Sequence, residues 1–254
     1  MDRNKSAYKL KDFGPLYIIN LDGQPERWKW MQDQLDHWQL ENYERISAFD
    51  GRNSDLSDIL VDGYPNAVSP GEIGCVTSHL KAIKHWYDTT DAEYGIFMED
   101  DCDFVSVKCW PFSWREFMAR VPYDWDCVQI AVINPRKLVA NIHPRYVDDY
   151  STAAFVINRR YAEKLMHFHC RGDKFKLDNG VRPRAVADDL IYNAGKTYAI
   201  PLFLYKLELG SSIHPEHIDV FHKSSRQGLD HWWHNSASDM PIDKFFQYDT
   251  HELN

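Results

Sequence analysis

A dense group of carboxylates follows a short apolar run near the middle of the chain. The run covers residues 94–98, and the acidic residues directly behind it are Glu99, Asp100, Asp101 and Asp103. This order predicts a buried strand whose carboxyl end opens into a site. In an extended chain Asp100 would point to one side and the other three carboxylates to the opposite side, where they repel one another. A hard divalent cation such as Mg²⁺, Mn²⁺ or Ca²⁺ relieves that repulsion, so a metal site is favoured over a solvated acidic turn.

A second carboxylate pair, Asp188 and Asp189, opens a short expected helix. Adjacent acids at that place are typical of residues that cap a helix or interact with its dipole. The pair would also couple electrostatically and raise one pKa, which helps a general base to work near neutral pH. From the residues alone, the capping role is favoured over the catalytic one.

Hydrophobic patterns predict the elements that must position these carboxylates. Besides the run before Glu99, strands are expected at 16–19, 127–133, 152–157 and 198–204. Helices are expected to begin at Pro25, at a capping box over 69–72, at Asn158 and near Asp188. The tail beyond Ser224 is aromatic and shows no pattern. Alternating strands and helices predict an α/β fold with a mainly parallel sheet and helices on both faces.

Length and composition limit the organisation and the partners. The 254 residues are 44% hydrophobic, enough for one substantial core, and no linker divides them. We expect a single domain over 1–254, with a core at about 14–212 and an aromatic C-terminal tail at 213–254. The net charge of −9, with scattered Lys and Arg residues, argues against a nucleic-acid partner.

The cysteines and the apolar stretches bear on localisation. Five cysteines, an odd number without a CxxC pair, are typical of reduced thiols in a cytosolic protein. The N-terminal residues are charged and lack the apolar core of a signal peptide. The longest apolar stretch, 198–205, contains Pro201 and is too short to span a membrane. These features predict a soluble cytoplasmic protein without stable membrane insertion.

Several blocks along the chain resemble glycosyltransferase family 25, which includes lipopolysaccharide-type β-galactosyltransferases and collagen galactosyltransferases. The matching segments are residues 17–22 with Glu26 and Arg27, 45–51, 72–80, 97–101, 152–157 and 187–190. They follow the family's order. The resemblance implies a GT-A type, Rossmann-like fold, a UDP-sugar donor (commonly UDP-galactose), a divalent metal ion and inversion at the anomeric carbon. The acceptor would be a hydroxyl group of a glycan or of a glycosylated protein.

The same resemblance implies roles for the acidic group. Asp101 would ligate Mn²⁺ or Mg²⁺ directly, whereas Glu99 and Asp100 would contact ribose, the sugar or metal-bound water. Asp103 departs from the family pattern. Two interpretations of this residue remain: it is a second metal ligand, or its side chain is merely exposed. A metal ion that bridges both phosphates stabilises a departing diphosphate without a proton donor.

A late histidine and the second carboxylate pair complete the implied site. GT-A enzymes often bring a late histidine to the metal, and imidazole suits Mn²⁺ better than Mg²⁺. Among the twelve histidines we expect this ligand to be His214, in the loop after the last strand, with His217 and His222 as alternatives. Given the resemblance, Asp188 is favoured over Asp189 as the base for the acceptor hydroxyl.

Donor recognition is expected at the end of the first strand and along the capped helix. Asn20, Asp22 and Arg27 would hold uracil, ribose and phosphate, and the Arg27 guanidinium can make a forked phosphate contact. Asp50 lies in a loop whose small, turn-forming residues suit base binding. Ser78 and His79 are two further candidates beside the apolar stripe of the helix. Each would either face the donor or form a hydrogen bond within the core.

Two alternatives come from other functional classes. The segment 101–105 also fits the nucleophile motif of haloacid-dehalogenase phosphatases, with Asp101 and Asp103 as the acids and Asp188–Asp189 as a late metal pair. That motif normally closes the first strand of its fold, whereas residues 1–100 precede it here, so the glycosyltransferase is favoured. A catalytically silent sugar-binding module is the other alternative, and the intact carboxylates argue against it.

Overall fold

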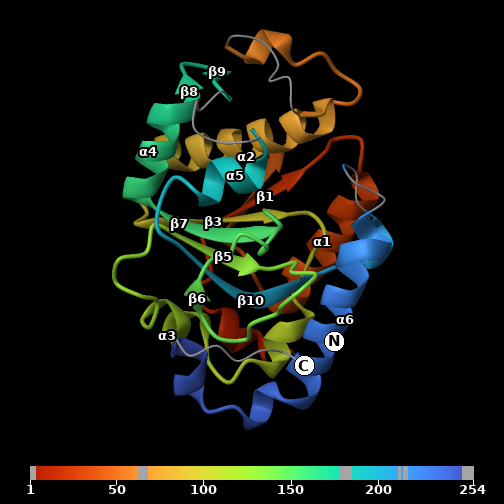
Figure 1. Ribbon diagram of the computed structural model, residues 1–254, viewed down its shortest axis with the longest axis vertical. Coiled ribbons are helices and arrows are strands. Elements are labelled where there is room, and N and C mark those ends of the chain that lie inside the picture. Colours follow the sequence, from red (N-terminus) through yellow and green to blue (C-terminus); the bar gives the residue numbers. More distant parts are fainter. Residues whose placement is uncertain (1–3, 62–67, 178–184, 211–212, 214–216, 248–254) are drawn as a thin grey trace.

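An eight-stranded sheet runs through the middle of the protein, with helices on both faces (Figure 1). The structure, a computed structural model, describes residues 4–61, 68–177, 185–210, 213 and 217–247. The strands of the sheet are β1 (Leu16–Asn20), β2 (Tyr43–Ser47), β3 (Tyr94–Glu99), β4 (Cys102–Asp103), β5 (Cys127–Ala131), β6 (His143–Pro144), β7 (Ala154–Asn158) and β10 (Thr197–Tyr205). A separate hairpin consists of β8 (Cys170–Arg171) and β9 (Lys174–Phe175). The helices are α1 (Pro25–Trp38), α2 (Pro70–Thr89), α3 (Trp114–Met118), α4 (Arg159–His169), α5 (Ala187–Tyr192) and α6 (Lys223–Asn235).

The sheet is mostly parallel. Its order is β2-β1-β3-β7-β5-β10-β4, with β6 paired to β10. The strands β2, β1, β3, β5 and β10 all run in one direction, whereas β7 runs antiparallel between β3 and β5. This arrangement confirms the α/β, Rossmann-like fold. In such a sheet the carboxyl ends of the parallel strands meet at one edge, which is where ligand sites form.

Local sequence signals position the helices as expected. At the start of α2 the Ser69 hydroxyl accepts the Glu72 N–H at 3.3 Å, and the Glu72 carboxylate accepts the Ser69 N–H at 2.7 Å. Pro70 occupies the first turn, where its missing N–H has no cost. Asn158 caps α4 by accepting the Tyr161 N–H at 2.8 Å. Both capping predictions are therefore confirmed.

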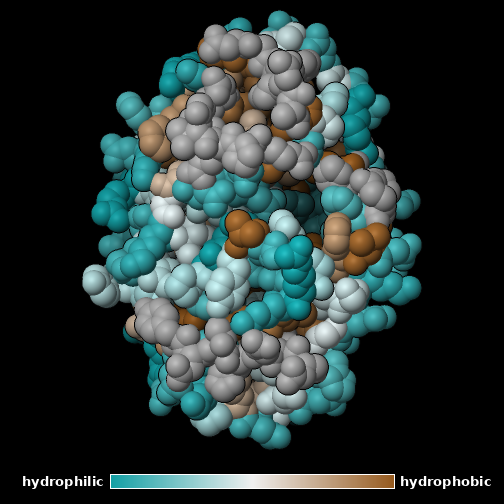
Figure 2. All heavy atoms as spheres, in the orientation of Figure 1, coloured by the Kyte–Doolittle hydropathy of each residue, from teal (hydrophilic) through white to brown (hydrophobic). Residues whose placement is uncertain are grey.

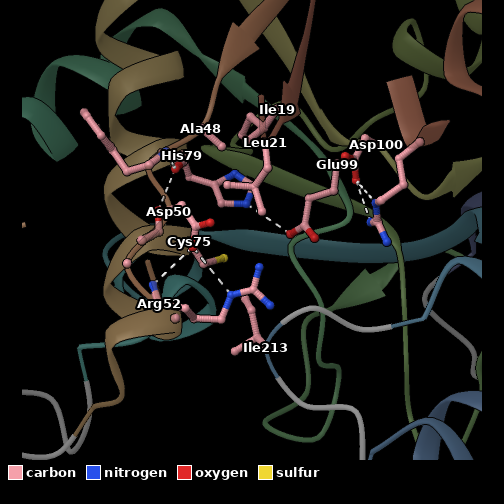
Figure 3. A pocket seen from close by; sticks show the side chains of 16 residues that line it. Ile19, Leu21, Ala48, Asp50, Arg52, Cys75, His79, Glu99, Asp100 and Ile213 are labelled. Carbon is pink, nitrogen blue, oxygen red and sulfur yellow. Dashed lines mark hydrogen bonds and ion pairs between the residues drawn. The ribbon is translucent and has the colours of Figure 1, made fainter. Parts of the chain in front are cut away.

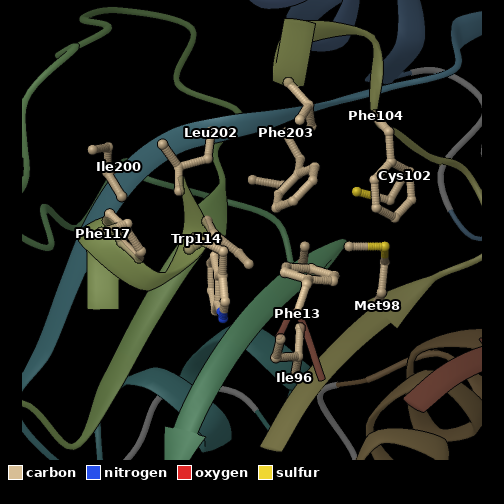
Figure 4. Close-up of a cluster of buried hydrophobic side chains, with 14 of the residues drawn as sticks. Phe13, Ile96, Met98, Cys102, Phe104, Trp114, Phe117, Ile200, Leu202 and Phe203 are labelled. Carbon is tan, nitrogen blue, oxygen red and sulfur yellow. The ribbon is translucent and has the colours of Figure 1, made fainter. Parts of the chain in front are cut away.

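Two apolar layers hold the helices on the sheet, which explains why the central strands are uniformly hydrophobic. The layer under α2, α4 and α5 contains residues of all three helices and one face of β1, β3 and β7. The opposite layer lies under α1, α3 and α6 and is rich in aromatic rings (Figure 4). There Phe13 packs edge-on against Trp114 at 4.7 Å between ring centroids, and Phe104 against Phe203 at 5.1 Å. The sheet is covered on both faces, as expected.

The C-terminal segment is part of this second layer. The pairing of β10 with β5 shifts register between Ala199 and Phe203, around Pro201, which has no N–H to donate. The Pro201 carbonyl accepts the Trp233 indole N–H at 2.9 Å, and Trp233 is buried at 1% exposure. The region beyond Ser224, in which the sequence shows no pattern, thus forms α6 and closes the core. Each helix among the described residues is too short or too polar to cross a membrane.

Replacing Trp233 with Ala should lower the free energy of unfolding by about 3–5 kcal/mol, because it empties a large core volume and leaves a buried carbonyl without its donor. Urea unfolding measures this change. Trp232→Ala is the matched control, since Trp232 is only partly buried, and its loss should be clearly smaller. Equal losses in the two variants would show that α6 does not anchor the core through Trp233.

Candidate active site

Two clefts lie at the carboxyl ends of the central strands. The first cleft, beside α2, is lined by Ile19, Leu21, Arg27, Ala48, Phe49, Asp50, Gly51, Arg52, Gly71, Gly74, Cys75, Ser78, His79, Glu99, Asp100 and Ile213. The second cleft, beside the end of β10, is lined by Glu99, Asp101, Ile133, Ser151, Ala153, Tyr205, Lys206, Leu207, Gly210, Ile218 and His222. The face in Figure 2 is hollowed near its centre, and hydrophilic residues surround much of the hollow. Glu99 lines both clefts and so stands between them.

The chain turns directly after β3, so the acidic residues do not alternate as an extended strand would. Asp100 and Asp101 form the turn, and the chain then enters β4 at Cys102. Glu99 and Asp101 both line the second cleft, but Asp103 lines neither cleft. One Asp103 oxygen accepts the Val105 N–H at 2.9 Å and the other the Arg226 guanidinium at 3.3 Å. The expectation that Asp103 shares one side with Glu99 and Asp101 is therefore wrong, because the turn resets the alternation.

Glu99 is held as an ionised carboxylate. Its Oε1 lies 3.1 Å from His79 Nε2 and accepts the Thr152 hydroxyl at 2.9 Å. Burial by itself would raise the pKa of Glu99, but the hydrogen bond and charge of His79, with help from Thr152, leave that pKa below its usual value. Negative charge is therefore fixed at the boundary of the two clefts.

Asp101 has the opposite electrostatics. Its Oδ2 lies 2.9 Å from an Arg27 nitrogen, while its Oδ1 is buried and has no hydrogen-bond partner among the described residues. Burial, reinforced by the nearby charges of Glu99 and Asp100 and opposed by Arg27, raises the pKa of Asp101 to about 7. A buried carboxylate oxygen without a partner is costly, and a hard cation is a ligand that relieves this cost. The side chain thus fits the metal ion that the sequence pattern implies.

Arg27 is fully engaged by protein groups. Its Nε and Nη2 donate to Asp100 Oδ1 at 2.8 and 2.5 Å, Nη2 also contacts Asp101, and Nη1 donates to the carbonyls of Leu209 and Gly210 at 3.1 Å each. Both Arg27 and Asp100 are buried. Because the fork is occupied by these acceptors, Arg27 positions the acidic turn and ties it to the segment after β10. A phosphate would have to displace these bonds.

Arg27→Ala should lower the free energy of unfolding by about 3–5 kcal/mol, because it leaves two largely buried carboxylates without their cation. Thermal and urea unfolding report the loss. Arg52→Ala is the matched control from the same cleft: the Arg52 side chain is 41% exposed, and its loss should change stability by about 0.5 kcal/mol or less. A stable Arg27→Ala variant would contradict the positioning role.

The other donor candidates, at the end of β1, both bond to Arg45 and to other neighbouring polar groups. Asn20 is buried, donates to Asp100 Oδ2 at 2.6 Å and accepts from Arg45 at 2.8 Å. Asp22 is exposed and accepts from Arg45 and Ser47 at 2.7 Å each. Neither residue lines the first or the second cleft: Asn20 supports the acidic turn through Asp100, and Asp22 bonds to Arg45 and Ser47 of β2.

The loop with Asp50 lies against α2 because two glycines allow close backbone approach. A Cβ on Gly51 would lie 1.8 Å from the Pro70 carbonyl oxygen, and one on Gly74 would lie 2.6 Å from that of Phe49. The Ser78 hydroxyl accepts the Phe49 N–H at 2.8 Å and so fixes the loop. Four predicted donor residues, together with Glu99 and Asp100 at the strand end, line the first cleft (Figure 3). The four are Arg27, Asp50, Ser78 and His79.

Asp188 lines neither cleft but is hydrogen-bonded to Ser151, which lines the second cleft. Its Oδ1 accepts the Ser151 N–H at 2.7 Å and lies 3.8 Å from an Arg145 nitrogen. Burial raises the pKa of Asp188, and Arg145 and the Ser151 N–H only partly oppose that rise. Asp189 instead accepts the Asn193 side chain on the outer surface of α5 at 3.2 Å. The N-cap position of α5 is occupied by Val186, whose side chain makes no capping hydrogen bond. Asp188 lies inside the first turn of the helix and is therefore not the capping residue that its position in the sequence suggested.

Arg52 and Lys206, which the sequence did not indicate as site residues, also line the clefts. Arg52 lines the first cleft, with its Nε 3.5 Å from Asp50, and Lys206 lines the second. Arg52 adjoins the segment 45–51 that resembles family 25, and that adjacency was an available signal. Of the late histidines, His222 lines the second cleft, and His214 lies outside the described residues.

A known protein family matches the segment that contains the acidic turn. Residues 13–110 match the model of glycosyltransferase family 25 (LPS biosynthesis protein). This segment includes Arg27, α2 and the turn after β3, and the family-25 match supports glycosyltransferase activity, which requires a sugar donor and an acceptor. Asp188 lies outside the matched residues.

The comparison with solved structures gives weak similarities. The crystal structure of A197 from STIV is 13% identical, with a TM-score of 0.41, and the match covers 74% of this chain and 82% of that one. The crystal structure of HddC from Yersinia pseudotuberculosis is 13% identical, with a TM-score of 0.34, covering 78% and 76%. At these scores neither structure bears on function. No curated protein gives a significant match.

Proposed function

We propose that the protein is a metal-dependent, inverting glycosyltransferase that moves a sugar, with galactose as the leading candidate, from a UDP-sugar to a hydroxyl of a glycan or glycosylated protein. The observation that carries the proposal is the buried Oδ1 of Asp101, in the turn after β3 and within the family-25 match, which has no hydrogen-bond partner among the described residues. A haloacid-dehalogenase phosphatase would place its nucleophile after the first strand of the fold. Here β1, β2 and β3 all precede Asp101.

Asp101 is the proposed metal ligand, and Mn²⁺ or Mg²⁺ is the proposed ion. When bound, such an ion would supply positive charge that stabilises the departing diphosphate. Glu99 lies beside it, ionised, with one oxygen held by His79 and Thr152. Asp103 forms an ion pair with Arg226, so we do not include it among the proposed metal ligands. His214 stays a proposed further ligand.

The first cleft is the proposed donor site. Asp50, Ser78, His79 and Asp100 line it with groups that can donate to or accept from a nucleoside. For the diphosphate we favour Arg52 over Arg27, because Arg27 is buried and bonded to Asp100, Leu209 and Gly210, whereas the Arg52 side chain is 41% exposed. A guanidinium that lines the cleft can make the forked contact that phosphate oxygens favour.

Asp188 is the proposed general base. It accepts the Ser151 N–H, and Ser151 lines the second cleft together with Glu99 and Asp101. Its raised pKa makes it a stronger base than an exposed aspartate. All five cysteines are free thiols, and a reducing compartment such as the cytoplasm keeps them so.

A donor screen tests the proposal. Purified protein should hydrolyse or transfer from one UDP-sugar in the presence of Mn²⁺, and EDTA should stop the reaction. GDP- and CMP-sugars serve as matched alternatives, and the anomeric configuration of the product tests inversion. Metal-independent turnover, or hydrolysis of simple phosphomonoesters instead, would contradict the proposed function.

A further inference from the structure

A second group of potential metal ligands, distinct from Asp101, lines the first cleft. Cys75, His79 and Glu99 each offer one ligand atom, and these atoms all lie within 4.8 Å of one another. Cys75 and His79 are four residues apart on α2, so their side chains lie one above the other on the same face of the helix. Glu99 reaches them from the end of β3. Figure 3 shows the three side chains around the same part of the cleft.

The histidine is only partly satisfied within the protein. His79 is 1% exposed, its Nε2 lies 3.1 Å from Glu99, and its Nδ1 is buried without a hydrogen-bond partner among the residues that the structure describes. The ring nitrogen that faces Glu99 is Nε2, so Nε2 is the atom through which His79 would bind a cation shared with Glu99.

We propose that Cys75, His79 and Glu99 form a site for a soft or borderline divalent cation such as Zn²⁺, separate from the hard-cation position at Asp101. Thiolate and imidazole are the ligands that select Zn²⁺ over Mg²⁺ or Mn²⁺, whereas Asp101 offers only carboxylate oxygen. Three protein ligands leave the fourth tetrahedral position open to water or to a ligand in the cleft.

The spacing suits such an ion after small side-chain movements. In tetrahedral Zn²⁺ sites with sulfur, nitrogen and oxygen ligands, neighbouring ligand atoms lie about 3.3–3.6 Å apart, as follows from the usual metal–ligand distances. The ligand atoms, which now all lie within 4.8 Å of one another, would have to move closer together to reach that range. Binding would exchange the His79–Glu99 hydrogen bond for two metal bonds and release the thiol proton of Cys75.

One consequence depends on the proposed function, whereas the binding itself does not. If the first cleft holds the nucleotide-sugar, an ion on Cys75, His79 and Glu99 would compete with the donor. Zn²⁺ would then inhibit an enzyme that Mn²⁺ activates. Direct metal binding is therefore the appropriate test, because its result is independent of whether the protein transfers sugars.

Cobalt titration of the metal-free full-length protein tests the site. Adding Co²⁺ should produce the near-ultraviolet thiolate-to-cobalt absorption and the visible bands of tetrahedral Co²⁺, which saturate at one equivalent and vanish when Zn²⁺ is added. Cys75→Ser should lose the thiolate band and bind Zn²⁺ at least tenfold more weakly. The matched control is Cys170→Ser, which removes a partly buried thiol on β8, outside the cleft, and should behave as wild type.

Two further variants keep the result interpretable. Glu99→Gln should also weaken Zn²⁺ binding at least tenfold, and it preserves a hydrogen-bond acceptor for Thr152 if Cys75→Ser does not fold. Asp101→Asn should retain the full cobalt spectrum. The proposal is overturned if wild type shows no thiolate band, if Cys75→Ser keeps it, or if Asp101→Asn abolishes it, since the last result would make the two positions a single site.

Discussion

Replacing Asp101 with Asn should strongly reduce metal-dependent sugar transfer and, at the same time, raise the melting temperature of the metal-free protein. The loss of transfer should be about 10²–10⁴-fold, because the charge of a bound metal ion is worth several kcal/mol in a transition state and each 1.4 kcal/mol is a factor of ten. Asn has the shape of Asp but not its charge. The buried Oδ1 position, which has no hydrogen-bond partner among the described residues, then no longer carries part of a negative charge.

The stability gain should depend on pH with a definite sign. The pKa of Asp101 is raised from 3.8 to about 7 in the folded protein, so the folded state holds this proton more tightly than the unfolded state does. Wild type therefore loses stability as the pH rises from about 4 to about 7, by up to about 4 kcal/mol, and Asn avoids the loss. The difference in melting temperature should be largest above pH 7 and vanish near pH 4, as thermal scans at several pH values would show.

Metal addition and a neighbouring variant provide the controls. Mn²⁺ should raise the melting temperature of wild type but not of Asp101→Asn. Asp103→Asn should keep the metal response, because the Asp103 oxygens bond to Arg226 and the Val105 N–H outside both clefts. If Asp103→Asn loses the metal response and Asp101→Asn retains it, the ion binds at the other end of the acidic group.

Replacing Asp188 with Asn should reduce transfer by about 10²–10⁴-fold, the range for losing a general base, and leave the affinity for UDP with Mn²⁺ nearly unchanged. Asn can still accept the Ser151 N–H, so the backbone around the second cleft should keep its position. Because the pKa of Asp188 is raised, wild-type kcat/KM should increase with pH through a value above the usual aspartate range. That increase should be absent from the residual activity of the variant.

Asp189→Asn is the matched control for this experiment. Its carboxylate bonds to Asn193 on the outer surface of α5, so its replacement should leave the pH profile as it is in wild type. A larger loss in Asp189→Asn than in Asp188→Asn would assign the base to the other member of the pair. Loss of UDP affinity in both variants would place the pair in the donor site.

Residues close together in the chain determined the features that depend on local chemistry. The capping box at Ser69–Glu72 and the Asn158 cap specify where α2 and α4 begin, because each satisfies backbone N–H groups within three residues. The run 94–98 specifies a buried strand, and the acids behind it specify charge at the strand's end. These predictions needed no contact distant in sequence, and the structure agrees with them.

The partner of each charged group was decided by the tertiary structure. Arg27 is 73 residues from Asp100 and 182 from Leu209, yet it bonds to both. The Asp103 carboxylate accepts a hydrogen bond from Arg226. The sequence of α6 shows no pattern, and this helix is held on the sheet by the hydrogen bond from Trp233 to the Pro201 carbonyl. Cys75 and His79 meet Glu99 only because α2 packs over the end of β3. Sequence patterns report which groups are charged or apolar, whereas a charge's effect depends on its nearest neighbours, and folding brings those from distant parts of the chain.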